Sequence, residues 1–147
     1  MRFGYTATRQ YRPMEHDAIV AEHLGQSLIA EDEDATFVTG GCRGGDRAVG
    51  TIAVVMYPDA RHEVVLPADR SQVDPWWAEP EYLTANIAIV ECPAGTDFRY
   101  RNTRIVDLSD KVTALPYGRL ERPRSGTWMT ANIARRAGKL WQVVVLP

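Results

Sequence analysis

Short runs of β-branched and apolar residues alternate along the chain with longer segments in which apolar residues recur at helical spacing. The short runs predict strands at residues 2–6, 35–39, 62–67, 86–91, 112–115 and 140–146, with a short helical stretch as the alternative at residues 86–91. The longer segments predict helices at residues 14–31, 46–56, 100–108 and 127–137, the last closed by Gly138. Residues 68–81 contain two prolines and two tryptophans, so we expect them to be irregular.

This alternation of strand, loop and helix predicts an α/β fold with a mostly parallel sheet. We expect a Rossmann-like three-layer sandwich joined by right-handed crossovers. The chain has 147 residues, of which 45% are hydrophobic, and this is enough to bury the core of one domain. We therefore expect residues 1–147 to form a single domain.

Charge, cysteine spacing and the lack of long apolar runs indicate which partners, thiol state and location to expect. The formal net charge is −2, which counts against general binding to nucleic acid. The basic residues are nearly all arginine, whose planar fork suits phosphate, although a GC-rich coding sequence gives the same bias. Cys42 and Cys92 have no paired spacing, so we expect free thiols. No apolar run is long enough to span a membrane and the start lacks a signal peptide's apolar core, so we expect a cytoplasmic protein.

The glycine-rich loop at residues 39–46 follows a predicted strand and precedes a predicted helix. Backbone N–H groups in such a loop can approach a phosphate closely, and the helix N-terminus adds a favourable dipole. Arg43 could clamp the same anion. Asp46 could cap the helix, which we favour, or accept a hydrogen bond from a ribose hydroxyl. A Gly41→Asp substitution is then expected to abolish binding with little loss of folding.

Two further loops follow predicted strands. Residues 6–9 present hydroxyls and a guanidinium, and residues 124–127 precede the last helix, where Ser125 or Thr127 could cap it. In a parallel sheet such loops meet at one edge, where ligands bind at the topological switch point. The expected phosphate- and ligand-binding residues are Thr6, Thr8, Arg9, Gly40, Gly41, Arg43, Gly44, Asp46, Arg101, Asn102, Ser125, Gly126 and Thr127.

Four segments carry a resemblance to a known family: TGGCRGGDRA at residues 39–48, RN at residues 101–102, DKVTALP at residues 110–116 and SGT at residues 125–127. In order and spacing they resemble the SLOG superfamily. It includes the Lonely-guy phosphoribohydrolases and the Rossmann-like domain of DNA-processing protein A, and the likeness is greatest to small bacterial and phage members. The resemblance implies that the glycine loop and the Gly-Thr pair hold phosphate and ribose, and that the Arg-Asn helix leans over the pocket. Relatives commonly form homodimers, for which the apolar face of the helix at residues 46–56 is a candidate.

The chain departs from the hydrolases of this family at one position. Their motif places a catalytic glutamate three residues after the Gly-Thr pair, and here that position is Thr130. The loop at residues 117–124 is also longer and more basic than the family's tight turn, which suggests an altered ligand or a mobile lid.

Three functions remain open. The first, which we favour, is a module that senses or sequesters a phosphorylated nucleotide. The second is a nucleoside-phosphate hydrolase in which Arg101 acts with a carboxylate from Glu91, Glu121 or Asp46. The third is a DNA-associated role, using a strip of arginines at Arg119, Arg122, Arg124, Arg135 and Arg136.

The remaining candidates for chemistry are weaker. His16, His23 and His62 lack the spacing of metal ligands, so we expect neither a metal nor another cofactor. Trp76, Trp77 and Tyr82 could stack on a base, but a hydrophobic plug or an oligomer contact is the favoured interpretation.

Overall fold

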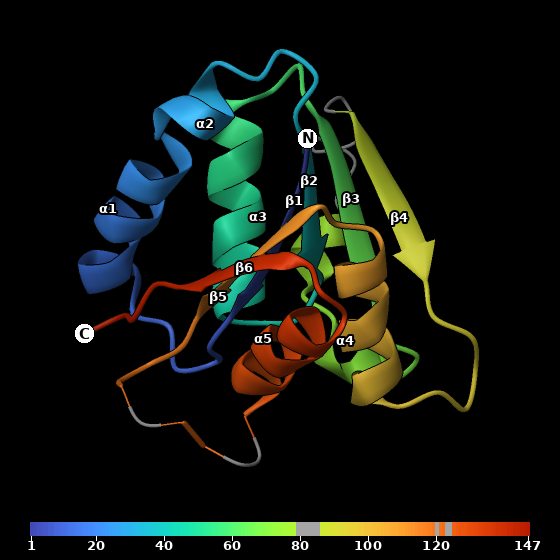
Figure 1. Cartoon of the computed structure of the whole chain (residues 1–147). Coiled ribbons are helices and arrows are strands. Elements are labelled where there is room, and N and C mark those ends of the chain that lie inside the picture. Colours follow the sequence, from blue (N-terminus) through green and yellow to red (C-terminus); the bar gives the residue numbers. More distant parts are fainter. Residues whose placement is uncertain (79–85, 120, 123–124) are drawn as a thin grey trace.

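Six parallel strands form one sheet at the centre of the molecule, in the order β4-β3-β2-β1-β5-β6 (Figure 1). A computed structural model describes residues 1–78, 86–119, 121–122 and 125–147. The strands are β1 Arg2–Ala7, β2 Thr36–Gly40, β3 Arg61–Leu66, β4 Ile87–Glu91, β5 Lys111–Leu115 and β6 Leu140–Val143. The helices are α1 Pro13–Leu24, α2 Ser27–Ala30, α3 Gly45–Met56, α4 Phe98–Asp107 and α5 Gly126–Arg136.

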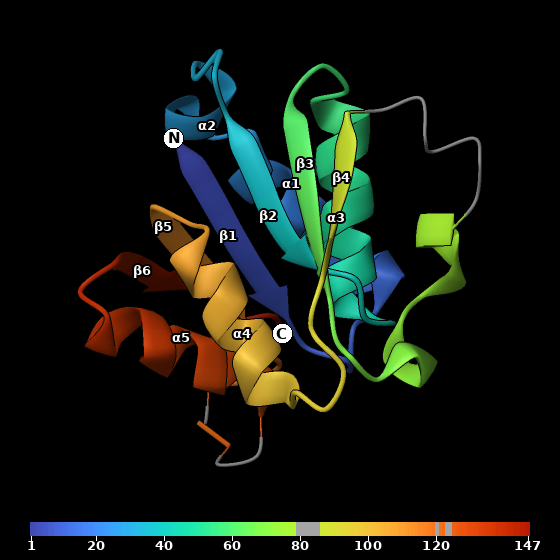
Figure 2. The ribbon, with the colours of Figure 1, turned by 90° about the vertical axis from the view of Figure 1, so that its right-hand side faces the viewer.

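Helices cover both faces of the sheet, which confirms the predicted three-layer, Rossmann-like fold of a single domain. Figure 2 shows α1, α2 and α3 on one side and α4 and α5 on the other. Successive side chains of a strand point to opposite faces, so neighbours in β2 enter different cores. Phe37 packs in the cluster that includes Tyr5 and Val49, whereas Val38 packs against Ile105 of α4.

The order of the strands creates a switch point beside β1. From β1 the chain moves outward through β2, β3 and β4, and then returns to place β5 on the other side of β1. The carboxyl ends of β1 and β5 lie side by side, with Ala7 paired to Leu115. In open α/β sheets this is where ligands bind, because the loops after these two strands diverge to opposite faces.

Two predicted elements are shorter in the structure. The helix expected at residues 14–31 is interrupted at Gly25, whose N–H donates to the carbonyl of Ala21 and closes α1. The strand expected at residues 140–146 ends at Val143, and the tail bends toward α1, where the Nε2 of His16 lies 2.8 Å from the carbonyl oxygen of Pro147.

The segment after β3 is irregular, as predicted, and contains two 3-10 turns, η1 Arg70–Gln72 and η2 Pro75–Ala78. Trp76 and Trp77 are buried against Val64 and Leu66, so the plug interpretation holds and base stacking does not. The rest of this predicted segment, with Tyr82, lies outside the described residues.

Helix α3 uses its apolar face within the domain. Val49, Gly50 and Ala53 are buried, and the helix packs against β1, β2, β3 and α1. This is the face that we considered for a dimer, and it is already covered by the chain's own sheet. Among the described residues, no helix combines the length and apolar character needed to cross a membrane.

Candidate functional site

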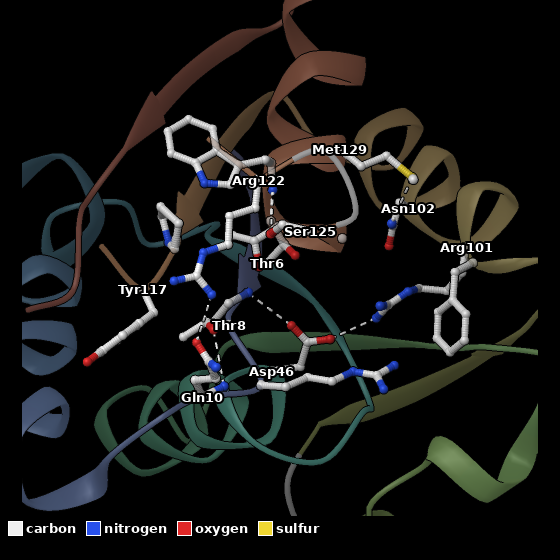
Figure 3. Close-up of a pocket in the computed structure, with 17 residues that line it drawn as sticks. Thr6, Thr8, Gln10, Asp46, Arg101, Asn102, Tyr117, Arg122, Ser125 and Met129 are labelled. Atoms are coloured by element: carbon white, nitrogen blue, oxygen red, sulfur yellow. Dashed lines mark hydrogen bonds and ion pairs between the residues drawn. The ribbon is translucent and has the colours of Figure 1, made fainter. Parts of the chain in front are cut away.

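A cavity of about 560 Å³ opens beyond the carboxyl ends of β1 and β5 (Figure 3). Its walls come from the loop after β1, the first turn of α3, one face of α4, the loop after β5 and the first turn of α5. The lining residues are Thr6, Ala7, Thr8, Arg9, Gln10, Asp46, Phe98, Arg101, Asn102, Pro116, Tyr117, Arg122, Ser125, Gly126, Thr127, Trp128 and Met129. The cavity therefore occupies the switch point of the sheet.

The loop after β1 continues the line of the strand into the cavity. The N–H of Thr8 donates to the carbonyl of Leu115 (3.1 Å), and its Oγ1 accepts from the N–H of Gln10 (3.1 Å). The guanidinium of Arg9 donates to Oε1 of Gln72 (2.9 Å) and lies 5.2 Å from the ring centroid of Phe98. Both contacts orient this guanidinium, and neither neutralises its charge.

The first turn of α5 forms the opposite wall. Ser125, one of the two residues predicted to cap this helix, is the N-cap. Its Oγ accepts a hydrogen bond from the N–H of Trp128 at 3.4 Å. The first N–H groups of a helix have no intrahelical acceptor, and the helix dipole makes this end positive. Arg122 lies beside it, with Nη1 3.4 Å from Oε1 of Gln10. Residues 120, 123 and 124 of the preceding loop lie outside the described residues.

A buried ion pair forms the floor of the cavity. Oδ2 of Asp46 accepts from Nη1 of Arg101 (2.8 Å), and Oδ1 accepts from the N–H of Ala7 (3.0 Å). Both residues are only 5% exposed. Burial alone would lower the pKa of Arg101, but the Asp46 carboxylate, together with the nearby Cys42 and Cys92, outweighs burial and leaves that pKa above its ordinary value.

The predicted role of Asp46 as a helix cap is wrong. The N-cap of α3 is Gly44, and Asp46 lies within the first turn, where it joins α3 to the end of β1 and to α4. The alternative, that Asp46 accepts a hydrogen bond from a ribose hydroxyl, stays a prediction.

The glycine-rich loop lies behind the cavity rather than in it. Gly40, Gly41, Arg43 and Gly44 do not line the pocket. A Cβ on Gly40 would lie 1.8 Å from Nη1 of Arg101, so this glycine makes room for the ion pair. A Cβ on Gly41 would lie 2.2 Å from Cδ2 of Leu66. The expectation that Gly41→Asp leaves folding intact therefore fails, because the new carboxylate would enter an apolar contact.

The end of this loop supports the loop after β1. The N–H of Gly45 donates to the carbonyl of Thr8 (2.9 Å), and a Cβ on Gly44, which has φ +89°, would meet the Arg9 backbone at about 3 Å. Arg43 is exposed and donates to the carbonyl of Ser71. These glycines allow two loops to pack closely, and any contact that they make with phosphate stays a prediction.

Helix α4 presents Phe98, Arg101 and Asn102 to the cavity. The ring of Phe98 lies within 6 Å of two guanidinium carbons, those of Arg9 and Arg101. Asn102 is 1% exposed, and its Nδ2 makes a contact of 3.6 Å with Sδ of Met129. Its Oδ1 is buried and has no hydrogen-bond partner among the described residues.

The groups considered for catalysis are mostly elsewhere. Thr130 is fully buried, and its Oγ1 donates to the carbonyl of Gly126 rather than facing the cavity. Glu91 pairs with Arg70, and Glu121 accepts from Asn132. Of the described residues that line the cavity, only Asp46 is a carboxylate. Burial raises the pKa of Cys42, which makes it a poor nucleophile at neutral pH.

Two other sequence predictions concern metal ligands and a DNA-binding strip of arginines. Within the described ranges, no three histidine, cysteine, aspartate or glutamate residues cluster as metal ligands would. The arginines proposed as a DNA-binding strip are divided, since Arg122 lines the cavity near the start of α5, whereas Arg135 and Arg136 lie at its other end. Arg124 lies outside the described residues.

The structure thus brings together nine of the predicted site residues: Thr6, Thr8, Arg9, Asp46, Arg101, Asn102, Ser125, Gly126 and Thr127. Sequence reasoning missed Phe98, Tyr117, Trp128 and Met129. Phe98 had a usable signal, because it precedes Arg101 by three positions and so shares its helix face.

No protein-family model matches the chain, and no curated protein matches it significantly.

Proposed function

We propose that the protein binds a phosphorylated nucleotide or nucleotide-derived ligand in this cavity, as a sensor or sequestering module. The observation that carries the proposal is the meeting of two cationic side chains and a helix N-terminus in a cavity at the switch point of the sheet. The resemblance of four sequence segments to the SLOG superfamily supports the same ligand class.

The charge of the cavity favours an anion with more than one negative charge. Asp46 neutralises Arg101, whereas among the described residues neither Arg9 nor Arg122 has a carboxylate oxygen within 4 Å, and Asp69 interacts with Arg9 only at longer range. Glutamine oxygens hold both guanidiniums in place without cancelling their charge. A phosphate monoester carries close to two negative charges at neutral pH and would match this excess. We therefore expect phosphate to lie near Ser125, Gly126 and Arg122.

The remaining walls suit the other parts of a nucleotide. Tyr117, Trp128 and Met129 give the cavity an apolar side, against which a base can stack. A cavity of about 560 Å³ falls in the range that holds ligands of this size. Binding without turnover is favoured over hydrolysis because the only carboxylate among the described lining residues, Asp46, is held in an ion pair.

The proposal is tested by a thermal-shift screen against nucleoside mono-, di- and triphosphates, NAD, ADP-ribose and cyclic nucleotides. A ligand at 100 times its Kd should add about 2.7 kcal/mol to the free energy of unfolding. Each mixture is then examined by mass spectrometry. A shift with the ligand intact supports a binding module, and release of base or phosphate would instead support the hydrolase.

A matched pair of variants locates the binding. Arg122→Gln removes a cation that lines the cavity and should reduce the shift, whereas Arg136→Gln removes an exposed cation at the far end of α5 and should not. No shift with any compound would contradict the proposal. We further propose a cytoplasmic location, where nucleotides are abundant and thiols such as the free Cys42 and Cys92 stay reduced.

A further inference from the structure

We infer that Asn102 recognises a sugar hydroxyl, so that the cavity selects ribonucleotides over nucleotides that lack the 2′- and 3′-hydroxyls. The inference rests on the proposed function and adds the part of the ligand that this side chain recognises. It begins from an amide that is buried in the wall of the cavity and whose oxygen has no hydrogen-bond partner among the described residues.

The amide of Asn102 is poorly satisfied by the protein. Its Oδ1 has no partner among the described residues, and the one contact of its Nδ2 is with Sδ of Met129, a weak acceptor. Native proteins pair most buried polar atoms, so an orphan in a cavity wall suggests a group that is paired only when a ligand is bound.

The position of Asn102 identifies the part of a nucleotide that it would meet. A Cβ built on Gly126 would lie 3.7 Å from Nδ2 of Asn102, so the amide lies beside the first residue of α5. That helix N-terminus is where we place the phosphate. In a nucleotide the sugar adjoins the phosphate and the base lies farther away. Asn102 is therefore at the right place for the sugar.

The chemistry of the amide also fits a hydroxyl. Oδ1 can only accept a hydrogen bond, which excludes a phosphate oxygen as its partner, and Nδ2 can only donate. A hydroxyl both donates and accepts, so it can pair with either end of the amide.

The test uses the four common ribonucleoside 5′-monophosphates and their 2′,3′-dideoxy counterparts, so that no base needs to be known beforehand. Affinities are measured by isothermal titration calorimetry or by NMR titration for weak binders. The wild-type protein should bind the ribo form about tenfold more tightly or better. Asn102→Ala should bind both forms equally, with the loss confined to the ribo form.

Two control variants separate recognition from folding. Asn132→Ala makes the same change on α5 outside the cavity and should keep the preference. Asn102→Leu fills a similar volume without hydrogen-bonding groups or charge, so it should also remove the preference for the ribo form. It tests the inference even if Asn102→Ala does not fold.

Equal affinity of the wild-type protein for the two forms would overturn the inference and leave the proposed function standing. A ribo preference that persists in Asn102→Ala would also overturn it. Failure of every nucleotide in the wider screen to bind would instead overturn the proposed function, and the inference with it.

Discussion

Two loops with glycines follow strands at the same edge of the sheet, and they differ in whether their glycines face the cavity. The glycine-rich loop at residues 39–46 contains four glycines, yet Asp46 is the only one of its residues that lines the cavity. The loop before α5 has Gly118, which does not line the cavity, whereas Gly126, the first residue of α5, lies in the cavity wall with Ser125 and Thr127. Glycine density therefore did not indicate which loop faces a ligand.

The difference lies in what each missing side chain makes room for. Around Gly40, Gly41 and Gly45, a Cβ would approach protein atoms within 2.5 Å. Around Gly126 the nearest such atom is 3.7 Å away, which is ordinary contact. The first set of glycines allows segments of the protein to pack together, and the second leaves a helix N-terminus accessible.

The largest expected effect concerns the ion pair for which Gly40 makes room. Arg101→Met leaves Asp46 buried without its partner and should lower the free energy of unfolding by about 3–5 kcal/mol. Adding Asp46→Asn removes that charge while keeping an acceptor for the N–H of Ala7, and should recover part of the loss. Urea denaturation measures both. A loss below about 1 kcal/mol would mean that water screens the interaction of Asp46 with Arg101, as it does for an exposed ion pair.

A pair of alanine substitutions compares the two loops directly. Gly41→Ala forces a methyl group against Leu66 and should cost about 1–3 kcal/mol of stability. Gly126→Ala places a methyl group in ordinary contact with Asn102 at the start of a helix and should change stability by less than about 0.5 kcal/mol. Thermal and urea denaturation report both values. Equal costs at the two positions would remove the distinction between the loops.

Substitution of one arginine in the cavity and one in the glycine-rich loop compares the two regions by ligand affinity. Arg9→Gln removes a cation from the cavity and should weaken binding of a nucleoside monophosphate by about tenfold or more. Arg43→Gln makes the same change in the glycine-rich loop and should leave the affinity within about twofold, because Arg43 does not line the cavity. Calorimetry provides both numbers. A larger loss of affinity in Arg43→Gln than in Arg9→Gln would indicate that the phosphate binds at the glycine-rich loop.

The smallest expected effect is a difference in thiol reactivity. Burial raises the pKa of Cys42 and, at the end of β4, that of Cys92, so both should react slowly with iodoacetamide at pH 7 and faster as pH rises above 9. A thiol introduced by Ser125→Cys would lie at the N-terminus of α5, where the dipole stabilises thiolate, and should be labelled at pH 7. Mass spectrometry of peptides identifies the labelled residue. Faster labelling of Cys42 would contradict this comparison.

The fold could be predicted because its signals are local. The run of β-branched and aromatic residues in β2, where Phe37 and Val38 enter opposite cores, is visible in five residues. The glycine-rich loop could not be interpreted in this way. The atoms that crowd Gly40, Gly41 and Gly45 belong to Arg101, Leu66 and Thr8, which come from other elements. Only the folded chain shows whether a glycine faces a ligand or its own neighbours.

The site was predicted where the logic of parallel sheets applies. Thr8, Arg9 and Ser125 follow strands that the topology places side by side, so their convergence was foreseeable. Tyr117, Trp128 and Met129 were missed because an aromatic or methionine side chain carries no sequence signal that separates a pocket wall from a core.

The central claim is that a phosphorylated ligand binds at the switch point between β1 and β5. An NMR titration of the ¹⁵N-labelled protein with the nucleotide that gives the largest thermal shift tests it most directly. The largest shifts should fall on the amides of Thr8, Gly126 and Thr127, with smaller ones at Gly41 and Arg43. Shifts centred on Gly41 and Arg43 instead would contradict the claim and place the ligand in the glycine-rich loop.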